Sequence, residues 1–303
     1  MNKNTGVIGN KKISSRLRNN LIGYSFILPN FTGFFFFILI PMSFSMLLSL
    51  MHWDGFNVMS FNGFKNFTAV LQDSVFRQSI NRTFVYTISC VVFTAFASLG
   101  LAVLLNRKFK GKGFFRSAIF FPHVASIVSI AVVWRLLFMR DLGPVNIFLT
   151  LIGIADPPGW FASTKWALPA VIIVAIWRSM GYYMIVYLAA LQNIPNELHE
   201  AASIDGASGF KFFWRIAFPQ LTPATFFVVL MLTVNSFKSF DIIFALTEGG
   251  PGTSTTLISN YIYNRAFIAF DYGQTSAAAM ILLVIVAAFT FFQFKLEKRI
   301  SQE

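Results

Sequence analysis

Charged residues are scarce in this sequence. Of its 303 residues only 12% are Asp, Glu, Lys or Arg, whereas 56% are hydrophobic. Soluble domains carry about 25% charged residues, so this composition indicates an integral membrane protein. The net charge of +12 would favour nucleic-acid binding if the basic residues formed one patch, but they fall in short clusters that flank apolar runs. We therefore expect a lipid membrane, and no nucleic acid, as the environment of the chain.

Cysteine and the common catalytic motifs are also missing. The single cysteine, Cys90, lies in an apolar run, which excludes an intrachain disulfide framework and a cysteine-rich metal site. No GxxxxGK[ST] phosphate loop, HExxH or GxSxG motif occurs, and the three histidines are widely spaced, at His52, His123 and His199. We therefore expect no enzymatic activity, no metal and no cofactor in this chain.

Long apolar runs are abundant by contrast. A helix needs roughly 20 mainly apolar residues to cross a bilayer, and six windows meet this requirement. They are residues 22–49, 83–106, 117–139, 167–192, 220–245 and 274–294. The sequence therefore predicts an all-α integral membrane protein with six transmembrane helices.

The basic residues predict the orientation of these spans. One side of the membrane receives the basic N-terminus, the cluster at 107–116, Lys211 and Arg215, and the basic C-terminus, while basic residues on the other side are balanced by acidic ones. The positive-inside rule places the first side in the cytoplasm. We expect a cytoplasmic segment 1–20, a transmembrane domain 21–294 and a cytoplasmic tail 295–303. The first apolar run is too long for a signal peptide and no cleavage site follows it, so it is interpreted as a retained span.

Two segments on the outer side have their own pattern. Residues 60–80 alternate polar and apolar residues at helical spacing, which predicts an amphipathic helix lying on the outer face or on a partner. Residues 142–166 carry Trp160 and Trp166 beside a span, as in an interfacial aromatic anchor. Packing at the membrane surface and contact with a substrate or partner both remain open for these segments.

The loop 193–219 interrupts the apolar pattern. Pro195 suits the start of a helix, Glu197 places negative charge near the N-terminal dipole, and Gly206 is a common helix stop, so a helix is predicted at about 195–205. Ser208 can cap a second short helix, which Pro219 would end or join to the fifth span.

The predicted helix of this loop is rich in small residues. Ala201, Ala202, Ala207 and Gly206 would allow the surface of another protein to approach the backbone closely. Asp205 near the C-terminal end is unfavourable toward the helix dipole and is expected to have a partner elsewhere. The alternative is a solvated loop helix with an ordinary glycine stop.

The loop contains a pattern made of Glu200-Ala201-Ala202, Asp205-Gly206-Ala207, Ile216 and Pro219. This pattern resembles the cytoplasmic signature of permease subunits of binding-protein-dependent ABC importers. The resemblance implies that the short helix is a coupling helix, which sits in a cleft of a separate ATPase subunit. It implies that ATP and Mg are bound by that ATPase, which forms a dimer. The coupling residues would then be Glu197, Glu200, Ala201, Ala202, Asp205, Gly206 and Ala207.

The resemblance extends to Trp134-Arg135, to Thr255 and to the sequence Thr247-Glu248-Gly249-Gly250-Pro251. These features resemble the carbohydrate-type permeases, the group for oligosaccharides and glycerol phosphate. The chain lacks the glycine-rich C-terminal tail of the second permease, so it resembles the first, maltose-type F-like subunit. This implies a heterodimer with a different permease in a bacterial or archaeal cytoplasmic membrane. An extracellular or periplasmic solute-binding protein would face Gly249, Gly250 and Pro251.

Several polar residues lie within the predicted spans. Arg178 is the deepest charge, while Arg135 and the Lys238/Asp241 pair lie nearer the outer boundary. Each of these residues is a candidate for direct contact with substrate. Alternatively, each forms a structural ion pair or extends its charged end toward the membrane surface. Sugar recognition needs hydroxyl-matching groups and aromatic faces. The residues that offer this chemistry are Tyr182, Tyr183, Tyr187, Asn235, Ser236 and Ser239, although such residues also join transmembrane helices.

The resemblance to carbohydrate-type permeases implies inward carbohydrate transport by alternating access, which is the predicted function. A permease for amino acids or peptides remains an alternative, because the coupling motif is shared between these classes. A secondary transporter would need ion-coupling carboxylates and usually internal repeats, and only Asp241 supports it. An intramembrane enzyme lacks any recognisable catalytic constellation.

Overall fold

The computed structural model describes residues 15–107, 109–207 and 209–300, and these residues are predominantly helical. The first half contains α1 (Ser15–Phe34), a π-helix (Phe35–Leu39), α2 (Ile40–Leu48), β1 (Met51–His52), β2 (Ser60–Phe61), α3 (Lys65–Gln72), α4 (Ser74–Asn106), α5 (Lys112–Val124), α6 (Ile127–Leu137) and α7 (Pro144–Leu151). The second half contains a 3-10 helix (Trp160–Ala162), α8 (Ala167–Gln192), α9 (Asn196–Ile204), α10 (Phe210–Phe212), a π-helix (Phe213–Ala217), α11 (Phe218–Gln220), α12 (Thr222–Phe237), α13 (Asp241–Thr247), α14 (Ile258–Phe267) and α15 (Tyr272–Ile300).

Four helical stretches among the described residues are long and apolar enough to cross a membrane. They are Ile22–Leu48, Ser74–Asn106, Ala167–Gln192 and Tyr272–Lys298. Two further apolar segments are helix pairs, α5 with α6 and α10–α11 with α12, bent by 100° and 66°. Counting each bent pair as one span gives the six expected spans.

The third predicted span, 117–139, consists of two helices, α5 and α6, that meet at a bend of 100°. Gly181 of α8 lies so close to α5 that a Cβ there would be 2.0 Å from the Ile119 carbonyl oxygen, which shows how tightly α5 packs on α8. After the extended residues Ala125 and Ser126, α6 leaves this contact and packs on α13. Hydropathy averaged over the whole window could not reveal the bend, because both halves are apolar.

The fifth predicted span, 220–245, also differs from the structure. At its start, Pro223 cannot donate to the carbonyl oxygen of Pro219, and its ring disfavours a continuous helix there, which accounts for the bend between α11 and α12. At its end α12 stops at Phe237, and α13 begins at Asp241. The three residues between them form a break inside the apolar run.

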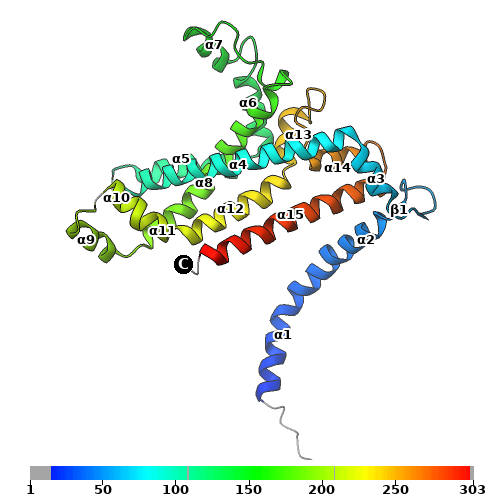
Figure 1. Ribbon diagram of the computed structural model, residues 1–303, viewed down its shortest axis with the longest axis horizontal. Helices are drawn as coiled ribbons and strands as arrows, with labels where there is room; N and C mark the ends of the chain where they lie inside the picture. The colour runs from blue at the N-terminus through cyan, green and yellow to red at the C-terminus, as the bar shows by residue number, and fades with distance from the viewer. Residues whose placement is uncertain (1–14, 108, 208, 301–303) are drawn as a thin grey trace, which may run out of the picture.

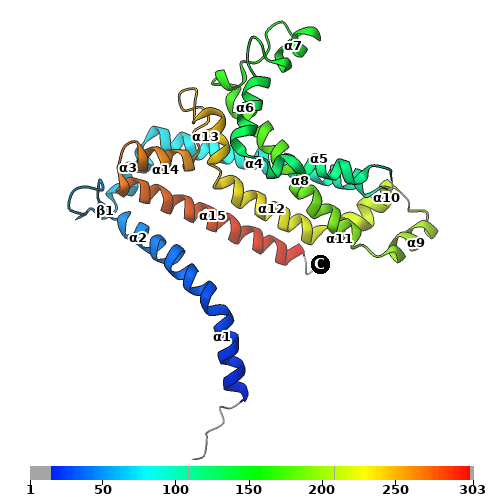
Figure 2. The same ribbon diagram turned by 180° about the vertical axis from the view of Figure 1, so that it is seen from behind.

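The long helices α4, α8, α12 and α15 lie lengthwise in one bundle (Figures 1 and 2). The short helices α9, α10 and α11 lie at one end of it, near the C-terminal end of α15, and the β1–β2 hairpin, α3 and α14 lie at the other. From this bundle α6 and α7 project as an arm, and α1 diverges from the bundle on the opposite side. The helix α15 continues without a break past residue 294.

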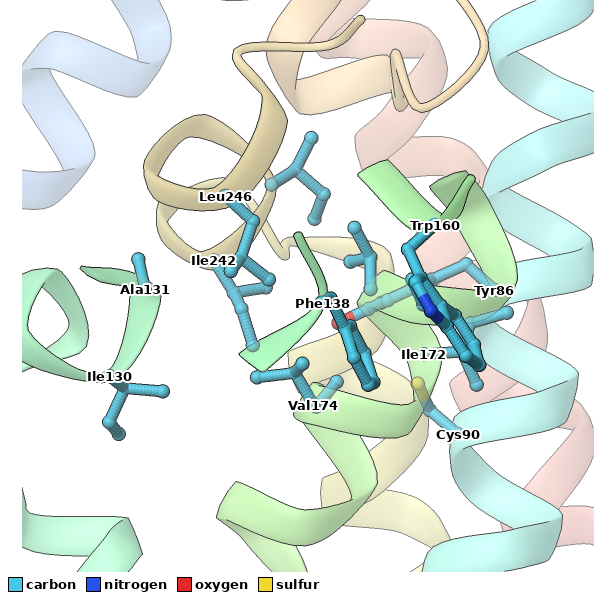
Figure 3. Close-up of a cluster of buried hydrophobic side chains, with 14 of the residues drawn as sticks. Tyr86, Cys90, Ile130, Ala131, Phe138, Trp160, Ile172, Val174, Ile242 and Leu246 are labelled. Atoms are coloured by element: carbon cyan, nitrogen blue, oxygen red, sulfur yellow. The ribbon is translucent and has the colours of Figure 1, made fainter. Parts of the chain in front are cut away.

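The largest buried cluster joins the arm to the bundle (Figure 3). Phe138 stacks on Trp160 with ring centroids 4.3 Å apart, and Trp160 Nε1 donates to Asn146 Oδ1 at 2.6 Å. Trp160 is only 9% exposed, so its expected role as an interfacial anchor was wrong, whereas Trp166 remains partly exposed at 38%. The indole of Trp160 is internal because both its ring face and its N–H find partners within the arm.

The segment 60–80 forms two helices in place of one. The apolar face of α3 carries the buried Val70, which packs in a cluster with residues of α15. Asp73 then ends α3 and caps α4, because its carboxylate accepts from the Val75 amide at 2.8 Å. The amphipathic pattern was therefore a packing face of this chain.

The carboxylate of Asp73 also connects the start of α4 with α14 at this end of the bundle. Asp73 accepts hydrogen bonds from the Arg265 guanidinium and from the Tyr261 hydroxyl, and Arg265 is its ion-pair partner. Burial alone would raise the pKa of Asp73, but the hydrogen bonds from Arg265, Tyr261 and the Val75 amide hold it below its usual value. Burial, together with the hydrogen bond to Asp73, raises the pKa of Tyr261 to about 12.

Candidate functional site

The first candidate site is the short helix α9. It spans Asn196–Ile204, which confirms the helix predicted at about 195–205. The chain turns at Gly206, whose φ of +69° is one that residues with a side chain adopt rarely, and the Ala207 amide closes the turn onto the Ala202 carbonyl at 2.8 Å. Ser208, the expected cap of the following helix, lies outside the described residues.

The residues expected on this helix divide into two groups. Glu197, Glu200, Ala201, Asp205 and Gly206 are exposed, and Ala207 is half-buried. Ala202 is 3% exposed and packs with Phe212 and Ala217, so it attaches the helix to the bundle instead of forming part of its free surface. Within the described residues the carboxylate of Asp205 has no hydrogen bond or ion pair, which leaves it available to another protein.

Sequence reasoning missed one residue of this surface. Ile204 is 87% exposed at the end of α9. It adds apolar area to a surface whose other exposed positions named above are small or acidic.

The second candidate site is a polar cavity of about 290 Å³ among the long helices. Its polar lining comes from α4 (Tyr86, Cys90, Thr94), α5 (His123), α8 (Arg178, Ser179, Tyr183), α12 (Asn235, Ser236), the break after α12 (Lys238, Ser239) and α13 (Asp241). The break between α12 and α13 thus contributes directly to the cavity, because it carries two of the lining residues.

Four of the six predicted pathway residues meet in this cavity: Tyr183, Asn235, Ser236 and Ser239. Two hydrogen bonds cross it, from Asn235 Nδ2 to Tyr183 Oη at 3.5 Å and between Tyr86 Oη and Ser239 Oγ at 3.1 Å.

The other two lie outside the cavity. The Tyr182 ring stacks on the His123 ring with centroids 4.7 Å apart. Tyr187 is 1% exposed within the cluster that joins α4, α8 and α12, so it serves the packing of these helices.

The intramembrane charges are arranged differently from the expected pairs. Lys238 and Asp241 both line the cavity, but no ion pair within 4.0 Å joins them in the part of the chain that the structure describes. Arg135 lies outside the cavity, where its Nε donates to the Leu246 carbonyl at 2.8 Å. Sequence reasoning missed Tyr86, Thr94 and His123, because they come from helices whose proximity is set by packing alone.

The third candidate site is the turn that follows α13. Thr255 Oγ1 donates to the Gly250 carbonyl at 2.9 Å, and Thr256 Oγ1 donates to the Gly249 carbonyl at 3.1 Å. Gly249 has a φ of +92° and is buried, and a Cβ there would lie 2.8 Å from Thr256 Oγ1. The turn is therefore an ordered element whose accessible part consists of Glu248, which is exposed, and of Gly250 and Pro251, which are half-buried.

No group of three or more His, Cys, Asp or Glu side chains suited to a metal occurs among residues 15–107, 109–207 and 209–300.

Comparison with known proteins places this arrangement in a family. Residues 95–302 match the model of the binding-protein-dependent transport system inner membrane component. The probable ABC transporter permease protein YesP of Bacillus subtilis is 37% identical over 94% of this chain and 93% of its own length. The sn-glycerol-3-phosphate transport system permease protein UgpA of Agrobacterium fabrum is 36% identical over 93% of this chain and 97% of its own.

A solved structure agrees with these relatives. A chain of a bacterial ABC transporter involved in the import of the acidic polysaccharide alginate has a TM-score of 0.81 and 25% identity, over 94% of this chain and 97% of that one. The chain belongs to the family of binding-protein-dependent transport system inner membrane components.

Proposed function

We propose that this chain is one of two permease subunits of an ATP-driven importer, and that the two together form a pathway for inward carbohydrate transport by alternating access. The observation that carries the proposal is the polar cavity midway along the membrane-spanning helices. Relatives named for the transport of glycerol phosphate, lactose and starch degradation products support the substrate class.

The chemistry of the cavity supports a carbohydrate. Sugars present many hydroxyl groups, which need both donors and acceptors, and apolar ring faces, which stack on aromatic side chains. Tyr183, Asn235 and Ser236 offer these groups on facing helices. The volume of about 290 Å³ is at the lower end of ligand pockets, so the second permease is expected to complete the site.

The energy source would be a separate ATPase dimer that binds ATP and Mg and docks on α9. The exposed carboxylates Glu197, Glu200 and Asp205 and the exposed Ile204 provide charge and apolar area for this contact. The absence of a GxxxxGK[ST] sequence from the chain is consistent with this division of labour.

At the other end of the bundle, the turn at Gly249, Gly250 and Pro251 would face a solute-binding protein. A chain of an alginate ABC transporter solved in complex with an alginate pentasaccharide-bound periplasmic protein shares this fold, with a TM-score of 0.83 at 24% identity. Both termini and α9 would lie in the cytoplasm of a bacterium or archaeon, with the turn on the outside.

The proposal is tested with the complete importer, purified with its second permease, ATPase and binding protein and placed in liposomes. We expect ATP hydrolysis to rise when saccharides are added, and not when amino acids or peptides are added. Stimulation by amino acids or peptides alone would contradict the carbohydrate assignment. Uptake that persists without the ATPase would contradict ATP-driven transport.

A further inference from the structure

The cavity carries an excess of positive charge. Arg178 lies near the middle of α8 and Lys238 directly follows α12, and both line the cavity. Asp241 is the one carboxylate among the lining residues. Two basic side chains and a single carboxylate therefore line the cavity, in a region where each charge is costly.

Arg178 is not neutralised by its own chain. The ion pairs of the described residues are Arg135 with Glu248 and Arg265 with Asp73, and Arg178 belongs to neither. Its Nε atom is buried and has no hydrogen-bond partner among the described residues, and the same holds for Nδ1 of His123 on a neighbouring helix. Buried polar atoms without partners are rare because they lose their hydration without compensation, so each one needs an explanation.

The contrast with Arg265, which is half-buried like Arg178, is informative. Arg265 uses its guanidinium on Asp73 and on the Tyr261 hydroxyl. In the cavity, Asp241 Oδ1 accepts from the Ile242 amide and is not within ion-pair distance of Arg178 or Lys238 in the described structure. The donors of Arg178 thus remain free toward the cavity.

We propose that the cavity selects saccharides that carry a negatively charged group, a carboxylate or a phosphate, and that Arg178 binds this group. The inference rests on the proposed function and names the charge of its substrate. An anionic group would supply the missing acceptor to the guanidinium, for which a charge-assisted hydrogen bond is stronger than a neutral one. Tyr183, Asn235 and Ser236 would remain for the hydroxyls of the same molecule.

The test compares matched substrates on the complete importer in liposomes. The panel contains neutral oligosaccharides, the corresponding uronic acid oligosaccharides and sugar phosphates, and the measurement is substrate-stimulated ATP hydrolysis. We expect the anionic members to stimulate most strongly. Arg178→Gln should lower the stimulation of ATP hydrolysis by anionic sugars about tenfold, which is the effect of one lost charge-assisted hydrogen bond. The stimulation by neutral sugars should stay within about twofold of its value in the unsubstituted importer.

Several variants separate charge from structure. Arg178→Lys keeps the positive charge and should retain most of the preference for anions. Arg140→Gln removes an exposed arginine of the arm, outside the cavity, and should change nothing. If Arg178→Gln fails to assemble, Lys238→Gln, on another wall of the cavity, should reduce the anionic preference in the same direction. Because one binding protein serves all variants, a changed ratio between anionic and neutral sugars belongs to this chain.

Two results would overturn the inference. The first is the strongest stimulation by neutral sugars, and the second is an equal effect of Arg178→Gln on both classes, as expected if the second permease supplies the counter-charge of Arg178. In either case stimulation by saccharides still supports the proposed function. A panel in which no saccharide stimulates would instead contradict the proposed function itself.

Discussion

Two arginines illustrate how single residues are used differently in the same bundle. Arg265 is bound by Asp73 and Tyr261 at the end of the bundle that carries the hairpin and α14. Arg178, near the middle of α8, has a buried Nε without a hydrogen-bond partner among the described residues. The ion pair of Arg265 joins distant segments of the chain, whereas the guanidinium of Arg178 still has a hydrogen-bond donor without an acceptor in the described structure. The hydrogen-bond partners of a charged residue thus distinguish a structural from a functional candidate better than its depth does.

The ion pair of Asp73 predicts a dependence of stability on pH. Its pKa is lower in the folded chain than in the unfolded chain, so its stabilising contribution is complete above the unfolded value and is lost as pH falls through the folded value. Asp73→Asn should therefore lower the free energy of unfolding at pH 7 by about 1 to 3 kcal/mol. Below about pH 4 the difference from the unsubstituted protein should shrink.

Thermal unfolding of the detergent-purified protein between pH 7 and pH 3 measures this effect. Asp141→Asn, at an exposed carboxylate of the turn before α7, serves as the control. Tyr261 does not titrate in this range, because its pKa lies at about 12. An equal loss of stability for Asp73→Asn at every pH would show that the ion pair is not the cause.

At the scale of elements, α9 was predictable and the bends of the spans were not. Its limits follow from residues close together in the chain, Pro195, Glu197 and Gly206, which act through local backbone preferences. The direction of α6 depends instead on the contact of α5 with Gly181, some sixty residues away in sequence. A local sequence pattern cannot predict a contact between segments so far apart in the chain.

The division of α9 into a free and an attached side predicts different effects of neighbouring substitutions. Ala201→Trp adds bulk at an exposed position and should reduce association with the ATPase by about tenfold, because one poorly fitting side chain costs about 1 to 3 kcal/mol at a packed surface, while folding is unchanged. Ala202→Trp should instead disturb the packing against Phe212 and Ala217 and lower the yield of folded protein.

Copurification of the ATPase with the permease, together with ATP hydrolysis stimulated by substrate, measures the coupling. Lys110→Trp places the same bulk at an exposed position in the turn between α4 and α5 and should leave association intact. Normal ATPase association by the Ala201→Trp importer would contradict the role of α9. Gly206 is less suitable for this test, because any side chain there is strained by the positive φ.

At the scale of the whole molecule, the bundle separates two surfaces. The helix α9 and the C-terminal end of α15 lie at one end, and the β1–β2 hairpin and α14 lie at the other (Figure 1). The cavity lies between these ends, because its lining residues come from inner parts of α8 and from the break after α12. In the proposed function, a conformational change of the bundle couples α9 to the cavity.

This arrangement predicts which residues a membrane-impermeant thiol reagent reaches. In a Cys90→Ala background, Val58→Cys, at a 93% exposed site of the hairpin, should be labelled in intact cells. Ile204→Cys on α9 should be labelled only after the membrane is opened, because the orientation proposed from the positive-inside rule puts α9 in the cytoplasm. Lysis should raise the labelling of Ile204→Cys and leave that of Val58→Cys unchanged. The reverse pattern would invert the proposed orientation.

The sequence alone predicted the membrane class, the number of apolar segments, the helix α9 and the family resemblance. These features depend on hydropathy, helix-capping residues and short motifs, all of which act over a few helical turns. The packing of distant segments decided the rest: the bends at α5–α6 and α11–α12, the burial of Trp160, the separation of Ala202 from Ala201, and the meeting of Arg178 with His123 and Asn235 in one cavity. These features depend on which helix faces contact one another, and that depends on how side chains from the entire chain fill the same volume.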